Sequence, residues 1–94
     1  MKQLEKIYWW DPTGMATWHD IEMVQRLEPA RCVTIAEVIH ETDDWIVTAA
    51  SHSNIEGAET EYADITVLPK GCITRRQPYI EKEHTENDLA DKQQ

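Results

Sequence analysis

Two apolar runs decide the fold, and both lie in the stretch Cys32-Val33-Thr34-Ile35-Ala36-Glu37-Val38-Ile39-His40-Glu41-Thr42-Asp43-Asp44-Trp45-Ile46-Val47-Thr48-Ala49-Ala50. The first run ends at Ile39, the second begins at Trp45, and the polar loop Glu41-Thr42-Asp43-Asp44 lies between them. Polar loops of this length between runs of β-branched residues are typical of β-hairpins. The stretch therefore predicts two paired strands in the middle of the domain.

Three further strands are predicted on either side of this hairpin. Ile7-Tyr8-Trp9-Trp10 ends at Asp11-Pro12-Thr13-Gly14, a composition that favours a turn. A later run, Ile65 to Leu68, breaks at Pro69-Lys70-Gly71 and resumes as Cys72-Ile73-Thr74. We therefore predict a mainly β (α+β) fold with five strands and one short helix, forming a single domain over residues 1–80.

The helix is predicted between the first strand and the hairpin. Thr17 followed by Asp20 resembles a weak capping box. Apolar residues then recur at helical spacing until Pro29, and they are Trp18, Ile21, Val24 and Leu27. This spacing predicts a helix of about two to three turns, with Trp18 placed to close the open end of a barrel.

Alternation along the first hairpin strand assigns its two faces. We expect Val33, Ile35 and Ile39 to share the core face, with Ile46 opposite them across the hairpin. On this assignment, Ile35→Ala leaves a cavity that costs about 2–5 kcal/mol.

Composition and charge limit the classes of partner. A chain of 94 residues with 40% hydrophobic content supports one core, and the acidic segment 81–94 is expected to be a mobile tail. The net charge of −9 disfavours nucleic acid as a partner. No apolar stretch approaches the roughly 20 residues of a membrane span, and the N-terminus does not resemble a signal peptide. We expect a cytoplasmic protein in which Cys32 and Cys72 are reduced, with a disulfide between neighbouring strands as the alternative.

A pattern of three short motifs resembles that of a group of small phage and prophage proteins. The chain carries Trp10-Asp11, then Val38 through the Glu41-Thr42-Asp43-Asp44-Trp45-Ile46 turn, and finally the corner Leu68-Pro69-Lys70-Gly71-Cys72-Ile73. The resemblance covers roughly residues 7–76 and implies a phage setting, in a bacterial host cell. The strand pattern also resembles SH3-like and Sm-like small barrels, which implies a five-stranded barrel of that kind.

The sequence contains no pattern that indicates catalysis or a bound cofactor. The spacing of His19, His40, His52 and His84 matches no metal-ligand motif. The three glycines are too few for a phosphate-binding loop, and no serine lies in a nucleophile motif. We therefore expect no enzyme activity, no metal and no cofactor.

The candidate binding residues are tryptophans, arginines and one histidine. Trp and Tyr stack on planar ligands and anchor interfaces, because each joins an apolar ring to a polar group. Adjacent residues of a strand point to opposite faces, so Trp9 and Trp10 must diverge. The loop 51–61 has one large apolar residue and is a candidate binding or assembly element. The predicted ligand-binding residues are Trp9, Trp10, Trp45, His52, Arg75 and Arg76.

Binding is therefore the predicted mode of action, and it has three forms. The first is a counter-defence or host-takeover factor, a homo-oligomer that sequesters a nucleotide-like host signal between its subunits. The second is an inhibitor whose acidic face masks a basic surface of a host protein. The third is an assembly accessory of the phage particle.

Overall fold

The computed structural model describes residues 4–80 and contains five strands and one short helix. The elements in chain order are β1 (Leu4–Asp11), α1 (Ile21–Val24), β2 (Ala30–Glu41), β3 (Trp45–His52), β4 (Tyr62–Pro69), the 3-10 turn η1 (Lys70–Cys72) and β5 (Ile73–Tyr79). These bounds confirm the mainly β prediction, and each predicted run lies within or next to its strand. The expectation for the tail 81–94 lies outside the described residues.

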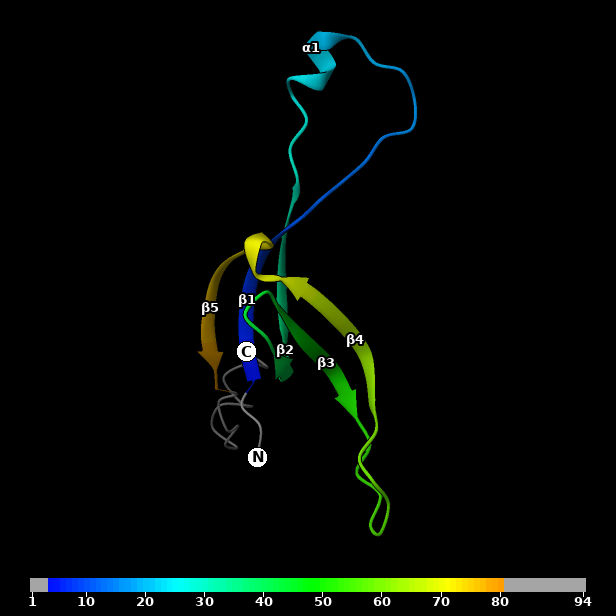
Figure 1. The fold of residues 1–94 in the computed structure, drawn as a ribbon, viewed down its shortest axis with the longest axis vertical. Coiled ribbons are helices and arrows are strands. Elements are labelled where there is room, and N and C mark those ends of the chain that lie inside the picture. Colours follow the sequence, from blue (N-terminus) through cyan, green and yellow to red (C-terminus); the bar gives the residue numbers. More distant parts are fainter. Residues whose placement is uncertain (1–3, 81–94) are drawn as a thin grey trace, which may run out of the picture.

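The strands form one antiparallel sheet in the order β4-β3-β2-β1-β5 (Figure 1). The short turn η1 carries the chain from β4 at one edge to β5 at the other, as the corner at Pro69 predicts. Its Lys70 N–H donates to the Asp44 carbonyl at 2.8 Å, which ties the corner to the β2–β3 turn. Within residues 4–80 the two edge strands do not pair with each other, so the sheet is unclosed.

The β2–β3 connection is a tight turn organised by Thr42. Its hydroxyl oxygen accepts the N–H groups of Asp44 at 3.2 Å and Trp45 at 3.1 Å, and its own N–H donates to the Trp45 carbonyl. Local bonds of this kind make threonine a turn residue. The hairpin predicted from the polar loop is therefore confirmed.

Two β-bulges change which side chains share a face. On β2 the register passes from Val38↔Thr48 to His40↔Val47, so Ile39 is an extra residue. On β5 the register passes from Tyr8↔Arg75 to Trp9↔Ile73, so Thr74 is extra. In a regular strand, residues an even number of positions apart point to the same side. Across each bulge, residues an odd number of positions apart do so instead.

The core lies on one face of the sheet, the inner face. Ile7 of β1, Ile46 of β3 and Leu68 of β4 are buried there, and the partly buried side chains that pack against them are Trp9, Val38 and Ile73. Buried Thr48 donates its hydroxyl to the Thr66 carbonyl at 3.4 Å. The core therefore joins β1, β3 and β4 across the curved sheet.

The predicted core face of β2 is wrong for Val33 and Ile35. Both side chains are exposed on the opposite, outer face, and Ile35 is 44% exposed. The inner face of β2 instead carries small residues such as Thr34 and Ala36. They fit there because large β1 residues lie beside them: Ile7 pairs with Thr34 in the register, and the Trp9 indole N–H donates to the Thr34 hydroxyl at 2.9 Å.

The β1–β2 connection, residues 12–29, projects from the sheet as an arm with α1 at its tip (Figure 1). All of its residues are exposed. The predicted helix is too long, because only Ile21–Val24 is α-helical, with Asp20 rather than Thr17 as N-cap. The prediction that Trp18 closes a barrel is also wrong, since Trp18 is 100% exposed.

A second projection extends the β3–β4 hairpin at the opposite end of the molecule (Figure 1). The Ser53 N–H donates to the Glu61 carbonyl at 2.8 Å, and the Glu61 N–H donates to the Ser53 hydroxyl at 2.9 Å. The two projections give extents of 56 × 42 × 23 Å and a radius of gyration of 18.7 Å, against about 12 Å for a compact domain of this size. Cys32 and Cys72 are free thiols, and no helix within residues 4–80 combines the length and apolar content needed to cross a membrane.

Candidate binding site

The outer face of β1 carries a row of alternating cationic and aromatic side chains. Tyr8 pairs with Arg75 of β5, and Trp10 pairs with Arg31 of β2. Side chains paired across antiparallel strands lie on the same face. We call the resulting set the cation–aromatic face, and its members are Lys6, Tyr8, Trp10, Arg31 and Arg75.

Close contacts between cations and rings hold this face together. The Arg31 guanidinium lies 5.0 Å from the centre of the Trp10 ring. Lys6 and Arg75 lie 5.4 Å and 5.5 Å from the centre of the Tyr8 ring. These distances are within the range at which a cation is attracted to a ring face. Tyr8 and Trp10 are therefore each paired with positive charge.

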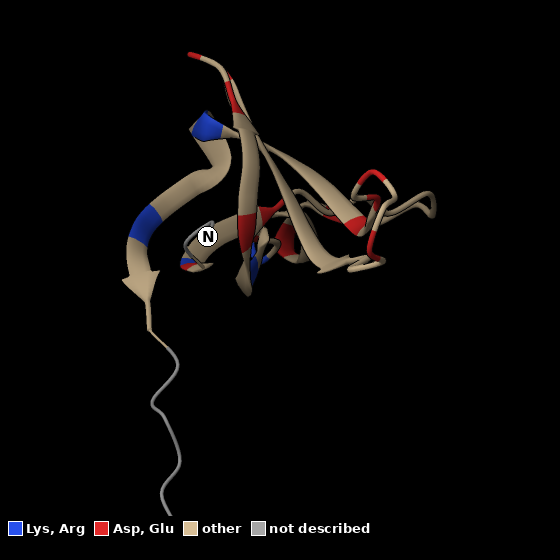
Figure 2. Cartoon of the chain, turned by 90° about the horizontal axis from the view of Figure 1, so that it is seen from below, with Lys and Arg blue, Asp and Glu red and all other residues tan. Residues whose placement is uncertain are grey.

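The positive charges of this face are not neutralised by carboxylates of the described residues. Among the described residues, Lys6, Arg31 and Arg75 form no ion pair, whereas Lys70 and Arg76 do. The chain from Lys70 to Tyr79 has three basic residues and no acidic one, as the ribbon of η1 and β5 shows (Figure 2). Lys70 and Arg76 are ion-paired, so the positive charge of the cation–aromatic face comes from Lys6, Arg31 and Arg75, on a chain of net charge −9.

A shallow hollow of about 190 Å³ lies within the cation–aromatic face. Tyr8, Trp10 and Arg31 line it, together with Val33 and Thr74. The Thr74 hydroxyl donates to the Tyr8 carbonyl at 3.2 Å, which fixes the bulge of β5 against β1. The ring faces and the unpaired Arg31 guanidinium line this hollow, and Lys6 and Arg75 lie beside Tyr8 outside its lining. Such a set can hold a planar ligand that carries negative charge.

The six predicted ligand-binding residues are not brought together. Trp10 and Arg75 belong to the cation–aromatic face, whereas Trp9 packs against the core on the inner face. Trp45 lies at the start of β3 with its side chain partly exposed. His52, at the end of β3, lies 3.2 Å from the Glu37 carboxylate and has an edge contact with the Tyr62 ring.

Arg76 is on the inner face and is engaged in an ion-pair network. Its guanidinium contacts the Glu5 carboxylate at 2.8 and 2.9 Å and the Glu41 carboxylate at 3.0 and 3.1 Å. The Lys70 ammonium contacts Glu41 at 2.8 Å. The network joins β5 to β1 and to the far end of β2, so it spans the open side of the sheet.

The ion-pair network shifts the pKa values of its members. Hydrogen bonds from Arg76 and then from Lys70 lower the pKa of Glu41 from its ordinary value of 4.5 to about 2. Hydrogen bonds to Glu5 and then to Glu41 raise the pKa of Arg76. Both shifts favour the charged forms. Arg76 is therefore a structural residue, and its neighbour Arg75 is the one free for a ligand.

The sequence reasoning missed Lys6, Tyr8 and Arg31. The alternation Lys6-Tyr8-Trp10 along one strand was a signal that could have identified the first two. Arg31 joins them only through the β1–β2 register, which residue spacing does not give.

No group of three or more His, Cys, Asp or Glu side chains suited to a metal ion occurs between residues 4 and 80. Comparison with protein-family models, with curated proteins and with solved structures finds no match to this chain.

Proposed function

We propose that this chain is a non-enzymatic binding protein that holds a nucleotide-like ligand on its cation–aromatic face. The observation that carries the proposal is the pairing of Tyr8 and Trp10 with Lys6, Arg31 and Arg75, none of which is neutralised by a carboxylate of the described residues. A nucleotide offers both a planar base and a phosphate. Base–aromatic stacking contributes about 1–3 kcal/mol per base, and arginine binds phosphate through two parallel hydrogen bonds.

The proposed role of this binding rests on the resemblance of the sequence to small phage and prophage proteins. The proposed protein is a counter-defence or host-takeover factor that acts in the cytoplasm of a bacterial host by sequestering a nucleotide-like signal between its subunits. Supporting this, the hollow is open to solvent on one side, and a second subunit placed there would enclose a ligand. A polynucleotide is not the proposed ligand, because the net charge of −9 opposes a long phosphate backbone.

The proposed fold class is an SH3- or Sm-like barrel whose closure is made by side chains. The supporting features are the pairing of β1 with β5, the short corner η1, and the contact of Arg76 with Glu41 across the open side of the sheet. On this proposal, ion pairs join β5 to the β2–β3 hairpin where backbone hydrogen bonds do not.

Titration with free nucleotides tests the proposed function. The probes are nucleoside monophosphates, nucleoside diphosphates and cyclic dinucleotides, and tryptophan fluorescence reports binding at Trp10. We expect Tyr8→Leu and Arg75→Gln each to weaken binding by about tenfold or more, because each removes one part of the stacked pair.

Tyr79→Leu is the matched control, since Tyr79 is a partly exposed β5 tyrosine that has no cation–ring contact with another residue of 4–80. Its affinity should equal that of the unchanged protein. Inorganic phosphate should bind far more weakly than a nucleotide, because it cannot stack. If no probe binds, or if Tyr8→Leu and Tyr79→Leu behave alike, the proposal is wrong.

Masking of a basic host surface is the second candidate. The observation that favours it is the acidic composition, with 18 Asp and Glu against 9 Lys and Arg. Such a complex forms mainly through charge, so its association rate should fall steeply with salt. Nucleotide binding at the cation–aromatic face with stacking retained at high salt would argue against this candidate.

A further inference from the structure

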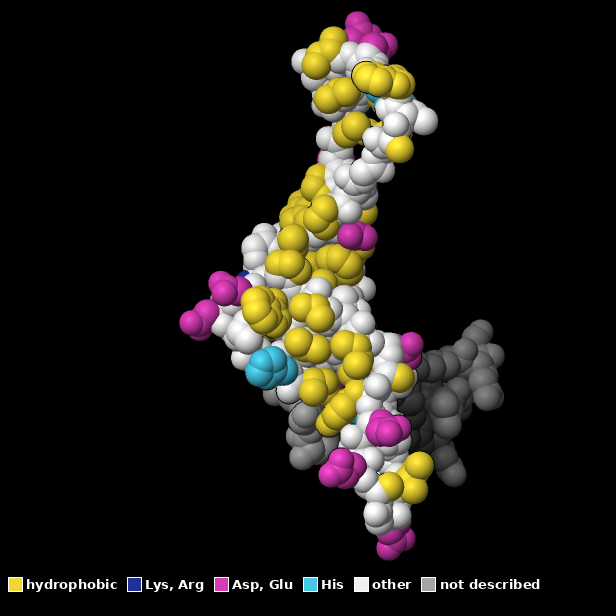
Figure 3. Space-filling model, turned by 45° about the vertical axis from the view of Figure 1, so that its right-hand side comes forward, with side chains coloured by type: hydrophobic (Ala, Val, Ile, Leu, Met, Phe, Trp, Pro, Cys, Tyr) yellow, Lys and Arg dark blue, Asp and Glu magenta, His cyan; other side chains and the backbone are white. Residues whose placement is uncertain are grey.

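The arm, residues 12–29, carries an unusual amount of uncovered apolar surface. Its exposed large hydrophobic side chains are Met15, Trp18, Ile21, Met23, Val24 and Leu27. Trp18 is 100% exposed and no residue of α1 is buried. Figure 3 shows hydrophobic side chains running from the arm onto the adjoining side of the sheet. Contiguous apolar surface of this kind marks an interaction site.

Few interactions within the monomer stabilise the conformation of the arm. The helix α1 has four residues, with an Asp20 cap that accepts the Met23 N–H at 2.9 Å. Isolated helices shorter than about 12–15 residues are marginal in water. The apolar side of the arm therefore needs a surface to pack against, and the sheet of its own chain does not provide one.

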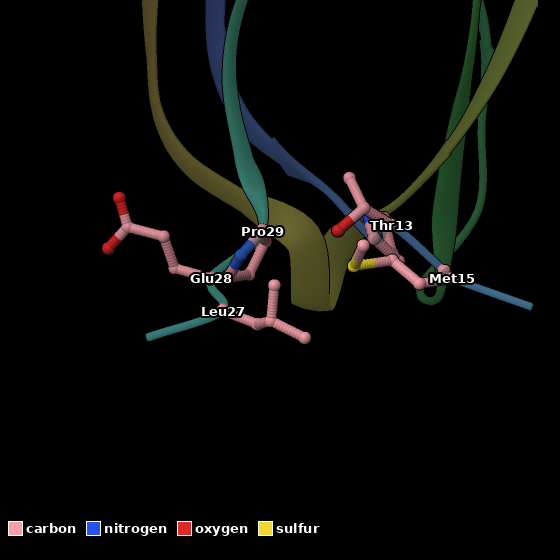
Figure 4. Close-up of a pocket in the computed structure, with 7 residues that line it drawn as sticks. Thr13, Met15, Leu27, Glu28 and Pro29 are labelled. Carbon is pink, nitrogen blue, oxygen red and sulfur yellow. The ribbon is translucent and has the colours of Figure 1, made fainter. Parts of the chain in front are cut away.

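Two hollows lie at the foot of the arm, where it leaves the sheet. One hollow of about 320 Å³ lies between the two chain segments that form the foot of the arm. Thr13 and Met15 line one side and Leu27 and Pro29 line the other, while the Glu28 carboxylate points away from the hollow (Figure 4). The other, about 530 Å³, is the foot hollow. It is lined by Trp10, Pro12, Glu28, Pro29, Gly71 and Cys72. Its volume is within the roughly 300–1,000 Å³ of sites that hold small organic groups.

We propose that two copies of this chain pair through their arms in antiparallel fashion, so that Trp18 of each copy enters the foot hollow of the other. A two-fold axis across the middle of both arms brings each tip to the foot of its partner. This inference rests on the proposed self-association of the protein and names the segment that produces it. It also brings the tip of a second subunit next to Trp10, the end of the cation–aromatic face.

The apolar area of the arms is adequate for such a dimer. One buried tryptophan removes about 150–250 Å² from water, and each arm adds five further apolar side chains. Because each contact occurs twice about the axis, the pair approaches the roughly 1,200–2,000 Å² of a stable interface.

Charged side chains lie at both the tip and the foot of the arm. Asp20, Glu22 and Arg26 lie at or beside the tip, and Glu28 lines the foot hollow. Antiparallel arms bring the tip of one copy, with its acidic and basic side chains, to the Glu28 carboxylate of the other. A second copy therefore supplies the apolar cover, and Arg31 stays with Trp10 on the cation–aromatic face.

Sedimentation of the full chain across the micromolar range tests the pairing. We expect the unchanged protein to dimerise, and Trp18→Ala and Ile21→Ser each to raise the dissociation constant by about tenfold or more. Neither substitution removes a buried side chain of the monomer, because Trp18 and Ile21 are both exposed. The matched control is Ile55→Ser in the other projection, since Ile55 is 68% exposed and Ile21 is 65% exposed.

The outcomes separate this inference from the ligand proposal. A dimer that is weakened by the two arm substitutions and not by Ile55→Ser supports it. A dimer that survives both arm substitutions overturns the arm pairing, while nucleotide titration still decides the ligand. A monomer at every concentration overturns the pairing outright.

A cross-link gives a second, direct readout. In a Cys32→Ser background, Thr17→Cys, which keeps Trp18, should form a disulfide with Cys72 of the other copy under mild oxidation. Ile55→Cys should not. Equal cross-linking of the two variants overturns the placement of the tip in the foot hollow.

Discussion

Replacing Ile7 by alanine is expected to lower the free energy of unfolding by about 2–5 kcal/mol. Ile7 is 0% exposed and packs with Ile46 and Leu68 from the strands β3 and β4. Few other residues are buried in the described part of the chain, so Ile7 makes up a large share of the core. Ile7, Ile46 and Leu68 join β1 to β3 and β4. The loss in unfolding free energy should therefore be near the upper end of this range.

Ile35→Ala is the matched control, because it makes the same chemical change on the outer face of β2. Its cost should be below about 1 kcal/mol. Urea denaturation followed by tryptophan fluorescence measures both variants. Equal losses for Ile7→Ala and Ile35→Ala would show that the outer face is covered in solution, which would make that face part of an interface.

Arg76→Met is expected to lower the free energy of unfolding by about 1–3 kcal/mol. The substitution keeps the apolar stem and removes the group that contacts Glu5 and Glu41. Two carboxylates then face each other with only Lys70 nearby. Arg75→Met is the matched control, since Arg75 lies on the opposite face and forms no ion pair with a described residue; its cost should be within about 0.5 kcal/mol.

Acid should weaken the protein through the same network. The pKa of Glu41 is about 2 in the folded chain and 4.5 ordinarily, so the unfolded chain binds the proton more readily. The stabilisation is fully present above pH 4.5 and is lost as the pH falls toward 2. Glu41→Gln should therefore flatten the fall in melting temperature over that range. A profile as steep as that of the unchanged protein would contradict the assignment.

The strands could be predicted because their signals are local. The Thr42 turn and the corner at Pro69 are set by short-range chemistry, and both lie where the sequence places them. The faces of β2 could not be predicted from β2 alone. Its inner face carries small residues because Ile7 and Trp9 of β1 fill the space beside them, and that depends on the register between the strands.

The candidate binding site, like the fold, could be predicted only in part. Trp10 and Arg75 are found by composition and alternation, whereas Arg31 joins them through pairing with β1. Arg76 looks equivalent to Arg75 in the sequence, yet its partner Glu41 is 35 residues away. The helical spacing of Trp18 and Ile21 was misleading, because an apolar face indicates only that a surface will cover it, and not which molecule supplies that surface.

The two bulges have a consequence for how the chain tolerates insertions and deletions. A one-residue deletion in a strand ordinarily inverts every side chain beyond it. At Ile39 the extra residue has no partner on β3, and at Thr74 the extra residue has none on β1. Its loss therefore leaves Val38 and Glu41, or Ile73 and Arg76, on the same side as before. Related chains can thus differ in length by one residue at these two points and keep both the core and the Arg76–Glu41 contact, so single-residue gaps in an alignment belong there.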